Sequence, residues 1–295
     1  MKIFIPERHN SVLDELDYHF EVVDNLKEAK VVVLWNDVGN VERGIIRLAR
    51  ALGKKTLVMQ HGRKGTSRYY PPFNEKIQAD RLLVWGDFDK RSLIQVGQDE
   101  RKIRVVGTTI LDGLPDRKEH EGTNLVFCPE HWDHDVEENA KVKKKLRKLR
   151  SKRKNIKITT KIIESHDAKN YDNPVFTNRN SDEHLRVCRE VLATADLVVG
   201  VSESTFELMA QAMDIPVVIM GDWTPKPCNG DERYKTYRRV ISKASKVATI
   251  KTLNETILDQ LAHPWELQGF RQIAVEQEGG PRNAIELIAK EINAL

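Results

Sequence analysis

Short apolar runs of strand-forming residues alternate with segments of helical periodicity along almost the whole chain. In the first part of the sequence, the predicted strands are residues 3–5, 31–35, 56–59, 82–85 and 103–106. Between them, residues 41–52 and 87–96 carry apolar side chains at the spacing of amphipathic helices. This alternation predicts an α/β fold, with a mainly parallel sheet and helices on both of its faces.

A second series of the same kind follows a polar break at residues 114–122, which contains a proline and a glycine. Its predicted strands are residues 124–128, 156–160, 175–177, 197–201, 217–220 and 247–250, and its predicted helices are residues 136–149, 183–193, 205–213 and 253–261. A last amphipathic helix, residues 283–295, follows Gly279-Gly280-Pro281. We therefore predict one domain over residues 1–116, a second over residues 123–280 and a C-terminal helix over residues 281–295.

The composition is that of a folded protein of about two domains. Of the 295 residues, 40% are apolar and 31% are charged. No stretch approaches the roughly 18–20 apolar residues of a membrane span, and the first residues lack a signal-peptide pattern. Cys128, Cys188 and Cys228 form no C-x-x-C pair, and we interpret them as buried filler rather than as catalytic thiols. These features predict a cytoplasmic protein with no membrane span.

Positive charge is concentrated in one segment. The net charge of +4 is modest, yet eleven of the seventeen residues from 141 to 157 are Lys or Arg. Val142, Leu146 and Leu149 recur at helical spacing within this run. We favour an amphipathic helix with a solvated basic face over a polyanion-binding site, which remains the alternative.

Ligands of open parallel sheets bind beyond the carboxyl ends of the strands, so the loops that directly follow strands are the first places to search. QHGRKG, residues 60–65, follows the predicted strand 56–59. Its glycines permit a tight turn and close backbone approach, and the imidazole of His61 can exchange a proton near neutral pH. Arg63 and Lys64 add positive charge beside it. The alternative is a surface turn with an incidental histidine.

VSESTFE, residues 201–207, follows another predicted strand. Ser204 and Glu207 have the spacing of a capping box, which by itself explains their presence. Capping and binding are compatible, because a helix N-terminus attracts anions. Ser202, Ser204 and Thr205 offer hydroxyl groups to such an anion, for which a diphosphate is the natural candidate. The chain contains neither G-x-x-x-x-G-K-[ST] nor G-x-G-x-x-G, which argues against a P-loop enzyme and an ordinary NAD-binding fold.

Two further loops of the second domain carry polar side chains. CPEHWDHD, residues 128–135, includes Glu130 and His131, which we expect to contact substrate. A metal site here is disfavoured because ligands from one loop rarely complete a coordination sphere. Lys161 and His166 follow the predicted strand 156–160 and could neutralise phosphate charge, or they could be ordinary exposed polar residues.

Taken together, these loop motifs resemble those of the GT-B glycosyltransferase-like superfamily. Residues 79–114, ending in VVGTTILDGL, are similar to a stretch of the UDP-N-acetylglucosamine 2-epimerases that ends in V-G-N-T-x-x-D. The order QHG, ADLVVGVSESTFE, IPVVIM resembles the CDP-glycerol glycerophosphotransferases and related surface-polysaccharide glycosyltransferases. The resemblance implies two Rossmann-like domains that face a cleft, with the C-terminal helix packed back on the first domain.

By position, the resemblance also implies roles for single residues. His61 would be the base or would orient the acceptor. Ser202, Ser204 and Thr205 would hold the donor diphosphate, and Glu207 would accept a hydrogen bond from the ribose. We further assign Glu7 and Arg8, beyond the first strand, to the acceptor side.

Two departures from the epimerase pattern weaken that branch of the resemblance. The epimerases have an acidic residue two places after the loop histidine, followed by Ala-Gly, where this chain has Gly62-Arg63-Lys64. Their Ser-Gly-Gly turn is Ser202-Glu203-Ser204 here.

The sequence therefore predicts a metal-independent glycosyltransferase-like enzyme. It would transfer a sugar or a phosphopolyol from a nucleotide-activated donor, with the nucleotide-sugar as co-substrate and no other cofactor. The acceptor would be a carbohydrate, a polymer or a nucleic acid. The alternatives are a nucleotide-sugar 2-epimerase or hydrolase, and a nucleotide- or polyanion-binding protein without turnover.

Overall fold

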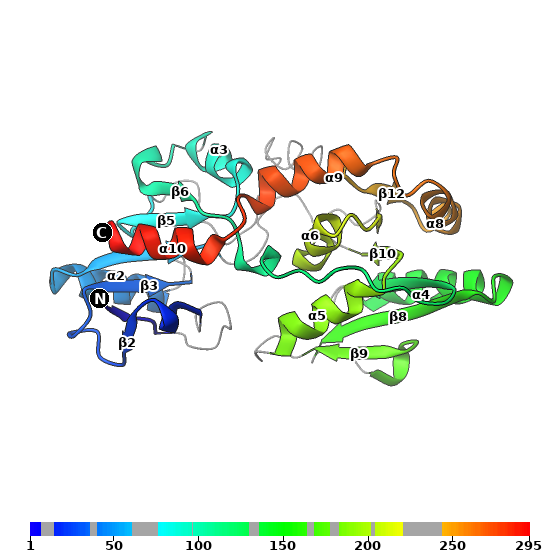
Figure 1. The fold of residues 1–295 in the computed structure, drawn as a ribbon, viewed down its shortest axis with the longest axis horizontal. Helices are drawn as coiled ribbons and strands as arrows, with labels where there is room; N and C mark the ends of the chain where they lie inside the picture. The colour runs from blue at the N-terminus through cyan, green and yellow to red at the C-terminus, as the bar shows by residue number, and fades with distance from the viewer. Residues whose placement is uncertain are drawn as a thin grey trace. The chain divides into compact units, whose positions relative to one another are not determined.

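The structure is a computed structural model that describes ten segments of the chain. These are residues 1–6, 15–35, 40–60, 76–95, 97–129, 136–163, 168–177, 183–201, 204–220 and 244–295. They form two compact α/β units, shown in Figure 1. Unit 1 comprises the described residues of 1–112 and 276–295, and unit 2 comprises those of 113–275.

Unit 1 is built on a six-stranded sheet in which every pair of neighbouring strands is parallel. Its strands are β1 (Lys2–Phe4), β2 (Glu21–Val23), β3 (Val31–Leu34), β4 (Lys55–Met59), β5 (Arg81–Val84) and β6 (Ile103–Val105), in the order β2-β1-β3-β4-β5-β6. Its helical elements are η1 (Glu15–Tyr18), α2 (Asn40–Ala51), α3 (Asp87–Gln95), η2 (Glu100–Lys102), η3 (Thr109–Leu111) and α10 (Ala284–Asn293). β3 and most of β4 are buried along their length, as expected for parallel strands covered on both faces.

The C-terminal helix α10 packs on unit 1, as the resemblance implied. Asp112 caps this helix, because its two carboxylate oxygens accept from the backbone N–H groups of Asn283 at 3.1 Å and Ala284 at 2.9 Å. Arg81 on β5 forms a 2.6 Å ion pair with Glu291. In Figure 1 the helix is the red one at the chain's C-terminus.

Two glycines allow the close backbone contact at the start of this helix. A Cβ atom on Gly107 would lie 2.0 Å from the carbonyl oxygen of Pro281, and one on Gly280 would lie 1.8 Å from that of Trp85. Both glycines also have positive φ angles, +82° and +71°, which other residues rarely adopt. The G-T-T-I-L-D stretch that carries part of the family resemblance therefore has a structural function here, which is to receive the C-terminal segment.

Unit 2 is a second sheet of six parallel strands. Its strands are β7 (Thr123–Cys128), β8 (Ile156–Ile163), β9 (Pro174–Thr177), β10 (Leu197–Gly200), β11 (Val217–Met220) and β12 (Lys246–Ala248), in the order β12-β11-β10-β7-β8-β9. Its helical elements are α4 (Val136–Lys152), η5 (Ala168–Asn170), α5 (Glu183–Ala193), α6 (Thr205–Ala212), α8 (Leu253–Ala262) and α9 (Gln268–Ala274). The π-helical turn η6 (Val275–Gly279) begins at the last residue of unit 2, and its other residues belong to unit 1. Val142, Leu146 and Leu149 of α4 lie in its core, which confirms the amphipathic helix predicted there.

The predicted α/β fold is confirmed, and each predicted strand and helix has a counterpart. Some predicted boundaries are wrong: the strand predicted over residues 156–160 continues to Ile163, because β9 pairs with it from Thr160 to Ile163. The strand β2 and the helix α9 were not predicted. Within the described segments, every helix is too short or too polar to cross a bilayer.

Candidate functional site

The strand order of unit 2 marks one edge of its sheet as a binding edge. Counted from β9, the order is β9-β8-β7-β10-β11-β12, so successive strands are added on one side of β7 and then on the other. Open parallel sheets bind ligands outside the carboxyl ends of their strands at such a reversal. Cys128, the last residue of β7, pairs in register with Gly200, the last residue of β10. The loops CPEHWDHD and VSESTFE, which the sequence singled out separately, therefore leave the sheet next to each other.

The helix that follows β10 begins with the predicted capping box. The backbone N–H of Phe206 donates to Ser204 Oγ at 3.2 Å, and the backbone N–H of Ser204 donates to Glu207 Oε2 at 2.8 Å. Ser204 Oγ also contacts Glu207 Oε2. The Glu207 side chain is 1% exposed, so contact with a ribose would require the box to open. The ribose contact of Glu207 stays a prediction.

Lys161 lies close to this helix N-terminus. It belongs to β8, and its Nζ is 5.5 Å from the centroid of the Phe206 ring, in the first turn of α6. An ammonium group over an aromatic face is held by the negative face of the ring. The structure thus places Lys161 against the first turn of α6, which begins at Thr205. Its contact with a phosphate stays a prediction.

Cys188 on α5 is near Lys161 but is not a reactive thiol. Its Sγ is 3.8 Å from His184 Nε2, and its side chain is buried. Burial raises the pKa of the thiol, and the nearby cations Lys161 and Arg189 offset this only in part. A thiol with a raised pKa stays protonated and is a poor nucleophile. Cys188 is therefore a core residue, as interpreted from the sequence.

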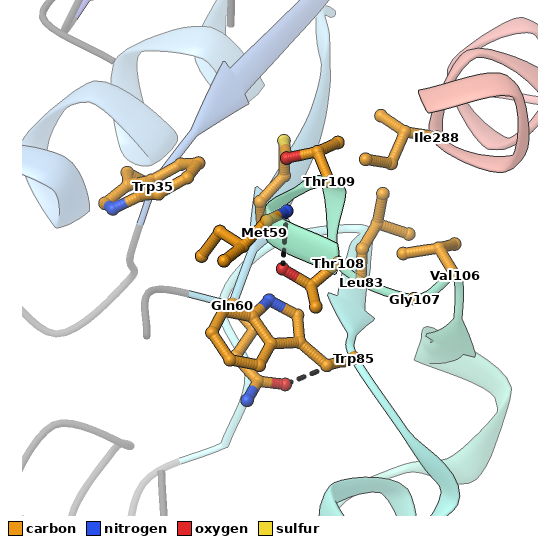
Figure 2. Close-up of a pocket in the computed structure, with 11 residues that line it drawn as sticks. Trp35, Met59, Gln60, Leu83, Trp85, Val106, Gly107, Thr108, Thr109 and Ile288 are labelled. Atoms are coloured by element: carbon orange, nitrogen blue, oxygen red, sulfur yellow. Dashed lines mark hydrogen bonds between the residues drawn. The ribbon is translucent and has the colours of Figure 1, made fainter. Parts of the chain in front are cut away.

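A pocket in unit 1 lies where four neighbouring strands end. It measures about 300 Å³ with the space at its open mouth included. Its lining residues lie near the carboxyl ends of β3, β4, β5 and β6, with Ile288 added from α10 (Figure 2); they are Trp35, Met59, Gln60, Leu83, Trp85, Val106, Gly107, Thr108, Thr109, Ile110 and Ile288. Most of them are apolar, and the hydroxyl of Thr109 is buried with no hydrogen-bond partner among the described residues. The enclosed part of the pocket is about 20 Å³, which is room for about one water-sized polar group beside that hydroxyl.

Gln60 fixes the chain at the point where it leaves β4. Its backbone N–H donates to Leu83 O at 2.9 Å. Its side-chain Oε1 accepts from the Trp85 backbone N–H at 2.8 Å, as Figure 2 shows, and its Nε2 donates to Asp89 Oδ2 at 2.9 Å. All four residues in these hydrogen bonds are buried. The residue that directly precedes His61 is therefore held in place from both the backbone and the side chain.

Most of the other residues selected from the sequence lie outside the described segments. These are Glu7, Arg8, His61, Arg63, Lys64, Glu130, His131, His166 and Ser202. Their assigned roles stay predictions. Among the residues that the structure does describe, no group of three or more His, Cys, Asp or Glu side chains is arranged to hold a metal ion.

Gln60, Trp35, Trp85 and Thr109 were not assigned a role from the sequence. Each of them comes directly after a strand or within a few residues of its end. Gln60 is the first residue of the selected loop QHGRKG, whereas Trp35 and Trp85 stand at the ends of the predicted strands 31–35 and 82–85, where the pattern indicates strand residues.

No family model and no curated protein matches the sequence, but solved structures match the fold. The H548A variant of the wall teichoic acid polymerase TagF aligns with a TM-score of 0.66 at 13% identity, over 100% of this chain and 88% of that one. UDP-GlcNAc 2-epimerase from Neisseria meningitidis, bound to UDP-GlcNAc, aligns with a TM-score of 0.65 at 12% identity, over 100% of both chains. MnaA from S. aureus, in complex with UDP, aligns with a TM-score of 0.56 at 11% identity, over 100% of this chain and 95% of that one. The two Rossmann-like units thus share the GT-B fold of these structures.

Proposed function

We propose that this protein transfers a sugar or a phosphopolyol from a nucleotide-activated donor to an acceptor hydroxyl. The observation that carries the proposal is the position of Lys161 beside the N-terminus of α6, at the strand reversal of unit 2. Similar structures with UDP-GlcNAc or UDP bound support a nucleotide-linked ligand.

The donor diphosphate would bind at the start of α6. A helix N-terminus presents unpaired N–H groups and a partial positive charge. Lys161 and His166 add cationic groups, and Ser202 and Thr205 add hydroxyl donors. Ser204 would add a third once its hydroxyl is released from Glu207. In a sugar transfer, the bond between the anomeric carbon and the diphosphate oxygen breaks, and the leaving nucleoside diphosphate gains negative charge. Donors already in place at that oxygen stabilise the charge as it develops.

The acceptor would bind on unit 1. We assign the base to His61, which would take the proton of the acceptor hydroxyl as its oxygen bonds to the anomeric carbon. The anchoring of Gln60 supports this assignment, because a base must be held at a defined distance from its substrate. The buried hydroxyl of Thr109 supports a polar acceptor at the adjacent pocket. Arg63, Lys64, Glu7, Arg8, Glu130 and His131 are the remaining substrate contacts that we propose.

A nucleotide-sugar 2-epimerase or hydrolase is the second candidate. The full-length alignment with the Neisseria epimerase favours it. The two candidates differ in what happens to a donor without an acceptor: an epimerase or hydrolase converts it, whereas a transferase leaves it largely intact.

A matched pair of lysines on one strand tests the donor site. Lys161→Met keeps most of the packing on Phe206 and removes the charge, whereas Lys157→Met removes the same charge from an exposed position near the start of β8. After a panel of UDP-, CDP-, GDP- and TDP-linked donors has identified a ligand by thermal shift, we expect Lys161→Met to weaken its binding roughly 10- to 100-fold. Lys157→Met should leave the affinity unchanged. Equal affinities for the two variants would contradict the site.

His61→Ala tests the role of the base in turnover. We expect it to lower kcat by about 10²- to 10⁴-fold and to leave donor affinity nearly unchanged. Conversion of the donor in the absence of any acceptor would instead identify the epimerase or hydrolase.

A further inference from the structure

Helix α4 and the turn after it expose a dense group of cations that the proposed function does not use. We call this group the α4 cation surface. It consists of Lys144, Lys145, Lys148, Lys152, Arg153, Lys154 and Lys157, of which all but the half-buried Lys145 are exposed. No acidic residue occurs between Val142 and Lys157.

Neighbouring cations of the same helix are neutralised, which separates them from this surface. Lys141 pairs with Glu137 at 3.0 Å and Glu138 at 2.7 Å. Arg147 and Arg150 share the carboxylate of Asp172 at 2.7 and 3.1 Å.

Lys143 is also engaged. It donates to Asn170 O at 2.8 Å and lies 5.2 Å from the centroid of the Tyr171 ring. In the part of the chain that the structure describes, the side chains of the seven cations of the surface form no ion pair, hydrogen bond or ring contact.

Helix stability does not account for the surface. Cations in the last turn, such as Lys152, interact favourably with the helix dipole. Lys144 and Lys148 are not in the last turn. They are four residues apart, and so are Lys148 and Lys152, a spacing at which like charges repel and weaken the helix. The sequence therefore keeps a repulsive arrangement that folding does not require.

The surface is also remote from the strand ends of unit 2 where a donor would bind. α4 follows β7 and packs on β8 (Figure 1). Its last residues lead into the first residue of β8, Ile156, at the amino edge of the sheet. Lys161 lies near the opposite, carboxyl end of that strand. A partner on the α4 cation surface is therefore distinct from the nucleotide.

We propose that the α4 cation surface binds a linear phosphodiester polymer through its backbone charges. A row of lysines with no anion of its own complements the regular charges of such a chain. Membrane insertion is disfavoured, because the apolar residues Val142, Leu146 and Leu149 are at most 3% exposed. Base stacking is disfavoured as well, because the nearby aromatic residue, Tyr171, packs against the core and contacts Lys143. This inference does not rest on the proposed transferase activity.

The test compares a clustered with a dispersed loss of charge. The variant K144Q/K148Q/K152Q removes three charges from the surface, and the control K118Q/K251Q/K290Q removes three charges from exposed positions elsewhere. The probes are a uridine oligonucleotide of RNA and an abasic phosphodiester strand of equal length, with affinity measured by fluorescence anisotropy at several salt concentrations. Circular dichroism confirms that each variant is folded.

We expect the wild-type protein to bind both strands alike and with steep salt dependence. Each lost phosphate contact reduces the magnitude of the slope of log K against log salt by about 0.7. The clustered variant loses three contacts, so the magnitude of its slope should be smaller than that of the wild type by about 2. Its affinity should fall by roughly several hundredfold at about 50 mM salt and roughly 30-fold at about 200 mM. The control should fall far less.

Three results would overturn the proposal. The first is equal losses in the clustered variant and the control. The second is binding that depends on the bases. The third is that the wild-type protein binds neither strand. Sedimentation of the protein with phosphatidylserine vesicles but without binding to either strand counts as this third result.

Discussion

Gln60 shows how one buried amide can determine the geometry of a loop that follows it. Both ends of its side chain are used, one on the backbone of Trp85 and the other on the carboxylate of Asp89. A buried polar group that loses its partner retains its full desolvation cost. The residue is therefore important for stability and, through His61, for the proposed chemistry.

We expect Gln60→Leu to destabilise the protein by about 2–3 kcal/mol, because the Trp85 N–H loses its acceptor and Asp89 loses a donor inside the protein. Urea denaturation followed by tryptophan fluorescence measures the change. Gln95→Leu, at an exposed position of α3, is the matched control and should stay within about 0.5 kcal/mol of the wild type. A similar small effect of Gln60→Leu would show that the two hydrogen bonds contribute little.

At the residue scale, local contacts were predictable from the sequence, and contacts between distant residues were not. The capping box was predictable because Ser204 and Glu207 are three residues apart. The partners of Gln60 are 25 and 29 residues away along the chain, so no local pattern connects them. The role of Asp112 as the cap of α10 spans 171 residues and was equally hidden.

At the scale of elements, helix α2 has one glycine inside it and another just after it, and the two have opposite roles. Gly44 is inside the helix, and a Cβ atom there would meet nothing within 4 Å. Gly53 follows the helix with φ +67°, and the backbone N–H of Lys54 donates to Ala49 O at 2.9 Å. This is the Schellman arrangement that ends many helices at glycine.

We expect Gly44→Ala to stabilise the protein by about 0.5–1 kcal/mol, because alanine loses less backbone entropy in a helix. Gly53→Ala should destabilise it by about 1–2 kcal/mol, because an L side chain is strained at positive φ. Thermal unfolding monitored by circular dichroism at 222 nm would show the two shifts. Shifts of the same sign would contradict the assignment of the helix end.

The two missed elements have different physical reasons. β2 has only three residues, too few to show a period. α9 has an inverted pattern, because its one large buried side chain is that of Arg271, bonded to Asp214 at 2.8 Å. The larger apolar side chains Phe270 and Ile273 are 45% and 46% exposed. The hydropathy pattern therefore predicts that the exposed face of this helix is the buried one. The parallel strands that are covered on both faces have apolar runs long enough for the sequence to predict these strands.

At the scale of the whole molecule, unit 1 is completed by a distant part of the chain. Gly107 and Gly280 let the backbone before α10 lie close to the backbone after β5 and β6. A Cβ atom on Gly107 would overlap the carbonyl oxygen of Pro281, and one on Gly280 would overlap that of Trp85. Asp112, Arg81 and the apolar Ile288 then hold α10 in place.

We expect Gly280→Ala to destabilise unit 1 by roughly 3–5 kcal/mol, which combines strain at positive φ with overpacking against Trp85 O. Gly53→Ala is the control for the φ effect alone, because its Cβ atom would meet nothing within 4 Å. Limited proteolysis near residue 280, together with urea denaturation, measures the release of α10. Equal destabilisation by the two substitutions would show that the close contact has no cost.

The docking of α10 has a consequence for translation. Asn283 leaves the ribosome 171 residues after its partner Asp112, a delay of about 10–30 s at typical synthesis rates. During that interval the nascent chain carries an unfinished first unit, with the surface around Gly107 accessible to chaperones, while the whole of the second unit is being made.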